Sequence, residues 1–262
     1  MSSNAMHVAA TGLNAQQTRL QVISNNLANV NTTGFKRDRA NFESLLYQTY
    51  KPAGAQTSEG TNMTSASAVG TGVRVVSTEK LYTQGSLVNT GNALDVAIDG
   101  MGFFQVLMPD GRMGYTRNGT FSQSADGTLT TPSGYVVQPE IQLPEGAVSI
   151  TISADGIVSA LMPDEIEAQE LGQITIASFA NPRGLQPVGE TFAVETAASG
   201  EAVIGTPTEP GFGKLVQGSL ESSNVNVVQE LVDMIETQRA YEVNSKSISA
   251  SNEMLQFLAN KL

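Results

Sequence analysis

The sequence predicts an α+β protein in which N- and C-terminal helices flank a central all-β domain that is rich in hairpins. Apolar residues recur with helical spacing near both ends of the chain, whereas short runs rich in β-branched and aromatic residues occupy the middle. Asp-Gly and Asn-Gly pairs, which favour tight hairpin turns, separate several of these runs. The composition agrees, because 25 glycines and only 15% charged residues suit a turn-rich β-protein better than a helical enzyme core.

The N-terminal segment, residues 1–46, is predicted to be a helical assembly segment. Its apolar residues recur at steps of three and four, the a/d spacing of a coiled coil: Met6, Ala9, Leu13, Leu20, Ile23, Leu27 and Val30. Four asparagines crowd into residues 24–31 (SNNLANVN), behind this pattern. Because asparagine competes for backbone hydrogen bonds and favours capping conformations, the cluster predicts that the helix ends there. Phe42, Leu45 and Leu46 form a second short apolar patch.

The C-terminal segment, residues 219–262, is also predicted to be helical, with a more regular heptad. Every seventh residue is apolar: Leu220, Val227, Met234, Tyr241, Ile248, Leu255 and Leu262. The companion d positions are mostly polar: Leu231, Gln238, Ser245, Asn252 and Ala259. Polar seam residues reduce stability but fix register and partner number. Ser223 or Asn224 is expected to cap the helix at its N-terminus.

Between the helices, residues 73–218 are predicted to form the β-domain. The Asp99-Gly100, Asp110-Gly111, Asn118-Gly119, Asp126-Gly127 and Asp155-Gly156 pairs are predicted hairpin turns. Residues 47–72 are rich in Ser, Thr, Gly and Ala, so composition alone predicts a flexible linker or a long loop.

The terminal helices are not expected to be stable by themselves. Burying an apolar side chain contributes roughly 1.5–3 kcal/mol, whereas ordering each residue costs about 1–2 kcal/mol of backbone entropy. One helix pair also leaves much of both apolar stripes in water. We therefore expect the chain ends to be disordered in the monomer and to fold when copies assemble.

Several kinds of chemistry are not supported. The net charge of −11 argues against nucleic-acid binding. Without cysteine the chain has no disulfide or thiolate metal site, and no stretch is apolar enough to predict a membrane span. The single histidine, His7, lies in a helical segment away from any candidate nucleophile. We therefore predict no enzyme, no catalytic residue, no cofactor and no metal site. The many carboxylates leave open a peptidoglycan-hydrolysing or peptidoglycan-binding domain.

Three motifs carry a family resemblance. Residues 24–37 (SNNLANVNTTGFKR) closely resemble the N-terminal signature of the axial proteins of the bacterial flagellum. Residues 223–248 (SNVNVVQELVDMIETQRAYEVNSKSI) resemble their shared C-terminal helix. DVAIDGMGFFQV and YTRNGTFS resemble the start of their common β-domain. The match is closest to the distal rod subunits, since residues 45–61 (LLYQTYKPAGAQTSEGT) resemble an insertion of that group that is thought to stiffen the rod. That resemblance favours an insertion ordered by its neighbours.

The resemblance implies a structural subunit that polymerises into a stiff, hollow, helical drive shaft transmitting torque from motor to hook. A proximal rod or hook-type axial subunit is the nearest alternative. The implied partners are further copies of the chain, proximal rod subunits, hook protein, ring bushing proteins and the type III export apparatus. The implied location is the periplasm-spanning rod of the basal body. The N-terminus lacks the features of a secretory signal peptide, which fits export without a cleaved signal.

The resemblance and the heptads together give two sets of candidate residues. The predicted assembly interface comprises Leu13, Leu20, Ile23, Asn25, Asn26, Leu27, Asn29, Val30, Gly34, Phe35, Val227, Leu231, Met234, Tyr241, Ile248 and Leu255. Five of these, Asn25, Asn26, Asn29, Gly34 and Phe35, are expected to form the elbow at which the inner helix ends. The predicted rod-stiffening insertion includes Tyr47, Gln48, Pro52, Gly54 and Gln56.

Overall fold

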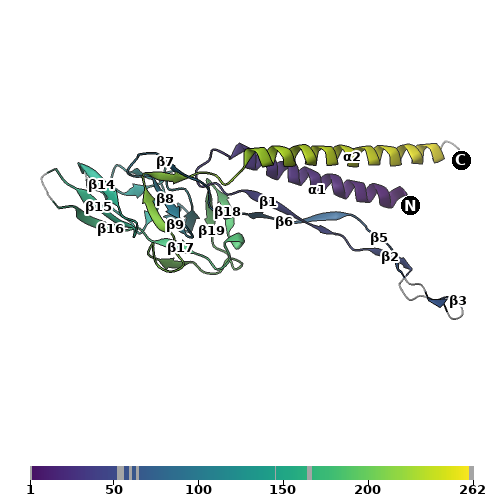
Figure 1. Ribbon diagram of the computed structural model, residues 1–262, viewed down its shortest axis with the longest axis horizontal. Coiled ribbons are helices and arrows are strands. Elements are labelled where there is room, and N and C mark those ends of the chain that lie inside the picture. The colour runs from purple at the N-terminus through teal and green to yellow at the C-terminus, as the bar shows by residue number, and fades with distance from the viewer. Residues whose placement is uncertain are drawn as a thin grey trace. The chain divides into compact units, whose positions relative to one another are not determined.

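The computed structural model describes residues 2–51, 56–58, 61–62, 65–144, 146–163 and 167–259 (Figure 1). The chain forms two compact units. The first, which we call the helical unit, comprises Met1–Leu27, Asp38–Glu79 and Asn226–Leu262. The second, the β-body, comprises Ala28–Arg37 and Lys80–Val225. The β-body thus includes ten residues, 28–37, that the sequence analysis placed in the N-terminal helical segment.

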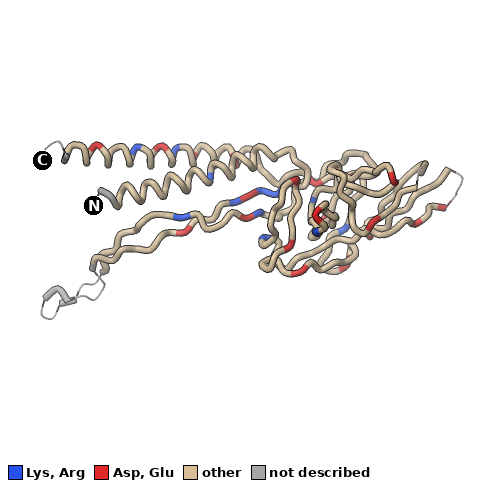
Figure 2. The backbone as a smooth tube through the Cα atoms, turned by 180° about the vertical axis from the view of Figure 1, so that it is seen from behind, with Lys and Arg blue, Asp and Glu red and all other residues tan. Residues whose placement is uncertain are grey.

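Two long helices of the helical unit confirm the predicted helices at both ends of the chain. Helix α1 is Ser2–Ala28 and helix α2 is Val227–Ala259. They lie side by side and antiparallel, because contacts along α1 meet α2 in reverse order (Figures 1 and 2). Asn26 hydrogen-bonds Glu230, Arg19 lies 3.7 Å from Asp233, and Gly12 packs against Asn244.

The cap of α2 differs from the prediction. Asn226 Oδ1 accepts hydrogen bonds from the amides of Val228 (3.0 Å) and Gln229 (3.2 Å), and so satisfies two of the free N–H groups of the first turn. Neither Ser223 nor Asn224 is the cap, because the helix begins only at Val227.

The expected N-terminal helical segment is wrong beyond α1. Strand β1 (Asp38–Ser44) pairs with β6 (Val73–Lys80) as a two-stranded ribbon. Three cross-strand polar pairs hold it: Arg39 with Glu79, Asn41 with Ser77 and Glu43 with Arg74. These alternate residues lie on one face of β1, so opposite charges across the ribbon stabilise a strand where the short apolar patch had indicated a helix. Thr11 Oγ1 on α1 accepts a hydrogen bond from Val73 N (3.3 Å).

The linker predicted from composition also contains strands. Strand β2 (Gln48–Lys51) pairs with β5 (Ser67–Val69), and β3 (Gln56–Ser58) pairs with β4 (Thr61–Asn62). Thr49, Tyr50 and Val69 are strand-favouring residues, which overall composition conceals.

The β-body confirms the predicted hairpin-rich β-domain. Its main sheet has the order β11-β12-β13-β9-β10-β19-β18, and β17 pairs with both β9 and β20. The bounds are β9 Phe103–Leu107, β10 Met113–Thr116, β11 Ser122–Gln123, β12 Leu129–Thr130, β13 Val136–Gln138, β17 Ile176–Ser178, β18 Gln186–Gly189, β19 Phe192–Val194 and β20 Val203–Gly205.

Smaller sheets complete this unit. A three-stranded sheet contains β14 Ser149–Ile152, β15 Ile157–Leu161 and β16 Gln169–Gln173. Two strand pairs join residues distant in sequence: β7 Leu87–Asn89 with β22 Ser219–Glu221, and β8 Val96–Asp99 with β21 Lys214–Gln217. One short 3-10 helix, η1, spans Pro182–Gly184.

Asp110-Gly111, Asp126-Gly127 and Asp155-Gly156 lie in hairpin turns, with glycine φ angles of 79°, 82° and 87°. The other two predicted hairpin turns are wrong. Asp99-Gly100 follows β8, which pairs with β21 and not with β9. Gly119 lacks a positive φ, and the strands on either side of Asn118-Gly119, β10 and β11, do not pair with each other.

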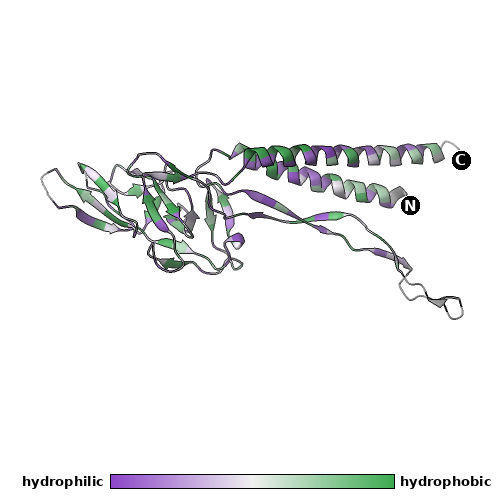
Figure 3. Cartoon of the chain, viewed as in Figure 1, coloured by the Kyte–Doolittle hydropathy of each residue, from purple (hydrophilic) through white to green (hydrophobic). Residues whose placement is uncertain are grey.

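The core of the β-body is centred on β9, which Figure 3 shows among the hydrophobic strands. Phe104 packs into one apolar cluster, and Phe103 packs into a second on the other face. Val106 is also fully buried. The Phe104 ring meets Phe121 edge-on at 5.0 Å. Phe103 and Phe104 are consecutive and therefore point to opposite faces of the sheet, so both faces of this strand are covered.

We predict that Phe104→Ala destabilises the β-body by about 3–5 kcal/mol, because it removes a fully buried ring and leaves a cavity. Leu107→Ala on the same strand is the control, since Leu107 is exposed, and it should cost well under half as much. Urea unfolding followed by circular dichroism measures both. Equal losses would contradict the assignment of β9 as the core strand.

Candidate assembly interface

The candidate site is a set of surfaces rather than a catalytic centre. Among the described residues, no three His, Cys, Asp or Glu side chains lie together as a metal site would require. Over that same part of the chain, neither helix is apolar enough to cross a membrane. His7 lies exposed on α1.

The seam between α1 and α2 is polar on the α2 side. Its buried residues recur every seven positions, as Glu230, Thr237 and Ser251, with half-buried Asn244 between the last two. α1 supplies mostly small residues, including Ala9 and Ala15, which bring little apolar area to the contact. This buried line lies one residue before the predicted d positions, since Leu231, Gln238, Ser245 and Asn252 are exposed, whereas the predicted a positions Met234, Ile248 and Leu255 are half-buried. The side chain of Ala259 lies outside the described residues.

Asn26 links α1 to α2 and to strand β1 through its side-chain hydrogen bonds. It is buried, and its Nδ2 atom donates to Glu230 Oε2 (3.2 Å) and to the Asp38 carbonyl (2.9 Å). Its Oδ1 atom accepts from the Asp38 amide (2.8 Å). Asn25 adds a hydrogen bond from Nδ2 to Asp38 Oδ2 (3.1 Å). One asparagine side chain thus joins α1, α2 and the first residue of β1.

Within the described part of the chain, the contact between α1 and α2 also contains a buried polar atom without a hydrogen bond. Gln16 Oε1 is buried there without a hydrogen-bond partner among the residues that the structure describes. An unsatisfied buried acceptor costs about 1–3 kcal/mol, more than a typical hydrogen bond contributes. The α1–α2 contact therefore specifies register better than it supplies stability.

The elbow after α1 is embedded in the β-body. The Thr32 amide donates to the Asn29 carbonyl (3.2 Å), which closes a turn directly after the helix. Gly34 has φ +69° and donates its amide to the Glu221 carbonyl (2.8 Å). Phe35 is buried, and Lys80 Nζ lies 4.9 Å from its ring centroid, within cation–π range. Val30 is half-buried.

The remaining predicted helix residues differ in exposure. On α1, Ile23 is buried, and Leu13, Leu20 and Leu27 are half-buried. On α2, the half-buried residues are Met234, Ile248 and Leu255, and the exposed ones are Val227, Leu231 and Tyr241.

A second apolar line on α2 was missed from the sequence. We call it the outer stripe: Val228, Val232, Ile235, Val243 and Met254, which are 46–71% exposed. Its first three members follow i, i+4, i+7 spacing, the period of one helix face. This face lies away from the buried Glu230 and Thr237, so it is not the face that packs on α1. The spacing was visible in the sequence, but the stronger seven-residue repeat obscured it. Hydrophobic bands recur along α2 in Figure 3.

The insertion presents exposed aromatic rings on its two-stranded ribbon. Tyr47 and Tyr50 are 64% and 60% exposed, and Leu46 is 90% exposed. The Gln48 side chain accepts a hydrogen bond from Asn4 on α1 (3.3 Å). Pro52 and Gly54 lie outside the described residues, as does the side chain of Gln56.

We predict that Gly34→Ala destabilises the β-body by several times the cost of Gly134→Ala. Both glycines have positive φ, +69° and +84°, so each substitution carries a left-handed strain of about 1–2 kcal/mol. Only at Gly34 would the new methyl group meet backbone, 2.6 Å from Asn118 N, whereas Gly134 faces open space. Chemical denaturation compares the two variants. Equal costs would show that residue 34 is not wedged against residues 117–118.

Comparisons with known proteins agree with this architecture. Family models match three parts of the chain: residues 6–36 match "Flagella basal body rod protein", 97–160 match "Flagellar hook protein FlgE/F/G D1 domain" and 216–262 match "Flagellar basal body rod FlgEFG protein C-terminal".

Whole-length relatives bear the name flagellar basal-body rod protein FlgG. The chain is 51% identical to that of Buchnera aphidicola subsp. Schizaphis graminum over 97% of this chain and 98% of the relative. It is 46% identical to that of Agrobacterium fabrum over 98% and 99%. The Bacillus subtilis relative is 38% identical over 98% of each chain. These relatives are structural proteins of the flagellum and not enzymes. The chain belongs to the family of flagellar basal-body rod proteins named FlgG.

Proposed function

We propose that this chain is the subunit of the distal rod, and that copies polymerise into a stiff, hollow, helical shaft that transmits torque from motor to hook. The observation that carries the proposal is the two-faced character of α2. One face packs polar residues on α1, while the opposite face exposes the outer stripe. The whole-length match to rod proteins supports the distal rod over hook-type subunits.

The free energies of burial and of association favour several neighbouring copies around each chain. Fully burying a side chain such as Val232 or Ile235 contributes roughly 1.5–3 kcal/mol, so the five residues of the outer stripe supply on the order of 10 kcal/mol. Association alone costs about 4–15 kcal/mol. A single contact between two copies is therefore marginal. A helical polymer, in which identical heterologous contacts repeat without closing, multiplies the contacts of each copy.

The predicted interface residues divide into two roles in this proposal. Ile23 and Asn26 set the register of α1 on α2, whereas Val227, Leu231 and Tyr241 extend the exposed surface beside the outer stripe. Because the α1–α2 seam is mostly polar, the helices gain their stability from neighbouring copies. They are disordered in the monomer and fold as the polymer grows.

The insertion acts as the stiffening element. A two-stranded ribbon is marginally stable alone, and Tyr47 and Tyr50 offer large rings for a neighbouring copy. The remaining parts of the proposal come from the family resemblance. The rod spans the periplasm, its subunits leave the cell through the type III apparatus without a cleaved signal, and its partners are proximal rod subunits, hook protein and the ring bushing.

We predict that Ile235→Asp abolishes polymerisation, because it buries a carboxylate in the proposed contact between copies. The matched control is Gln238→Asp, which adds the same charge at an exposed α2 position outside the outer stripe. Sedimentation of purified chain measures assembly, and swimming of a complemented rod-deficient strain measures function. The β-body should keep its denaturation midpoint in both variants. Normal polymers of Ile235→Asp would exclude the outer stripe as the interface.

A further inference from the structure

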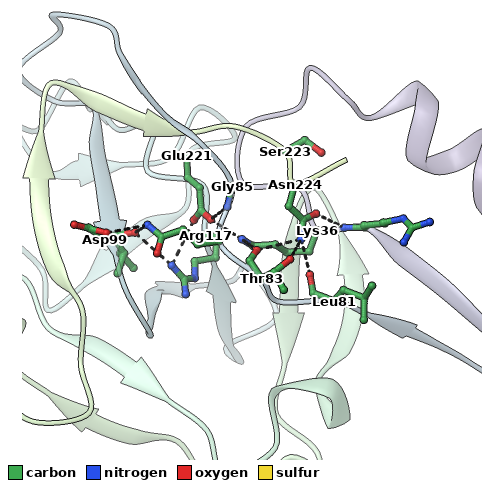
Figure 4. Close-up of polar contacts among 12 residues, drawn as sticks. Lys36, Leu81, Thr83, Gly85, Asp99, Arg117, Glu221, Ser223 and Asn224 are labelled. Atoms are coloured by element: carbon green, nitrogen blue, oxygen red, sulfur yellow. Dashed lines mark hydrogen bonds and ion pairs between the residues drawn. The ribbon is translucent and has the colours of Figure 1, made fainter. Parts of the chain in front are cut away.

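A buried ion cluster lies inside the β-body and joins three distant segments (Figure 4). Glu221 on β22 is completely buried, and the Lys36 and Arg117 side chains beside it are 3% and 5% exposed. Glu221 Oε1 accepts from Lys36 Nζ (2.5 Å) and from the Gly85 amide (2.8 Å). Its other oxygen, Oε2, lies 3.4 Å from Arg117 Nη1.

The cluster holds two cations and one carboxylate. Burial lowers the pKa of the Lys36 ammonium and of the Arg117 guanidinium, and the Glu221 carboxylate opposes both shifts. Lys36 Nζ also donates to the Thr83 carbonyl (2.8 Å), and Arg117 Nη2 donates to the Gly100 carbonyl (2.7 Å). Without Glu221, two like charges would be buried together without a counter-charge, compensated only in part by carbonyl dipoles and by the Phe103 ring, 5.4 Å from the Arg117 guanidinium.

Asn224 completes the same arrangement three residues beyond Glu221. Its Oδ1 atom accepts from the Arg37 amide (2.7 Å), and its Nδ2 atom donates to the carbonyls of Leu81 (2.8 Å) and Thr83 (3.1 Å). The Leu81 amide in turn donates to the Arg37 carbonyl (2.8 Å). We call these segments, residues 34–37, 81–85 and 221–224, the clasp.

We propose that the clasp makes closure of the β-body one cooperative event that requires segments from both ends of the chain. Each clasp segment is held by the other two, and no segment keeps its buried polar groups satisfied when another leaves. Lys36 and Glu221 are 185 positions apart, so nearly the whole chain must be present before the clasp can close.

Because the clasp needs Glu221, it cannot close in a chain that lacks the C-terminal segment. A chain is made from its N-terminus, so Lys36 and Arg117 are available long before Glu221. Until Glu221 arrives, closing this region would bury two cations with no counter-charge, which disfavours closure. The clasp therefore keeps this part of the β-body open until the C-terminal segment is present. The inference does not depend on polymerisation, and it concerns the β-body alone.

Amide hydrogen exchange of full-length Lys36→Met tests the inference. We expect residues 34–37, 81–85 and 219–224 to exchange faster together, by about 10- to 100-fold, because one sub-global opening exposes all three. Amides of β9 and β10 should keep their protection. The control is Arg112→Met, which breaks an exposed ion pair with Asp110 in the same unit and should change none of the three segments.

Faster exchange confined to one of the three segments would contradict the inference. If exchange accelerates only at residues 34–37 and the other two segments stay protected, the segments are independent and the inference fails. Should Lys36→Met unfold the whole β-body, Asn224→Ala gives the decision, because it removes hydrogen bonds between the same segments without removing a charge. Joint acceleration at residues 34–37 and 81–85 in that variant supports the clasp, and acceleration at residue 224 alone overturns it.

Discussion

The structure depends on one constraint: helix α2 carries more apolar surface than α1 can cover. The residues of α2 that face α1 are Glu230, Thr237 and Ser251, while the outer stripe remains exposed. α1 cannot relieve this, because its buried face is made largely of alanine together with Ile23 and Asn26. In the proposed function, another copy of the chain covers the outer stripe, and this excess of exposed apolar surface on α2 drives polymerisation.

In contrast to α2, the β-body buries most of its apolar residues within its own fold. Phe104 belongs to one apolar cluster and Phe103 to a second, so a single central strand contributes to both. The β-body also contains a buried polar cluster, which was not predicted from the sequence. Lys36, Glu221 and Asn224 fasten segments from both ends of the chain within this body. A rod subunit built in this way pairs a self-sufficient body with helices that depend on their neighbours.

Sequence patterns predicted the helices and turns that depend on local periodicity. They failed where contacts between residues distant in sequence determine the secondary structure or the packing. Both terminal helices and three of the five predicted hairpin turns were predictable because helix and turn preferences act over a few residues. Residues 38–44 were misassigned because Arg39 and Glu43 pair with Glu79 and Arg74, about 30–40 positions later. On α2, the predicted a positions Met234, Ile248 and Leu255 are half-buried, but the buried d line begins at Glu230 and not at Leu231. Glu230 hydrogen-bonds Asn26, a long-range contact that the apolar heptad does not reveal. Lys36 and Arg117 lie in motifs quoted for the resemblance, yet their shared partner Glu221 is distant in sequence.

The most direct test of this account is amide hydrogen exchange on dilute monomer and on assembled polymer. We predict rapid exchange across residues 2–28 and 227–259 in the monomer, strong protection of both helices in the polymer, and protection of the β9–β10 core in both states. If α1 and α2 are already protected in a dilute monomer, the helix pair is stable without neighbours. The argument that unburied apolar surface on α2 drives assembly would then be wrong.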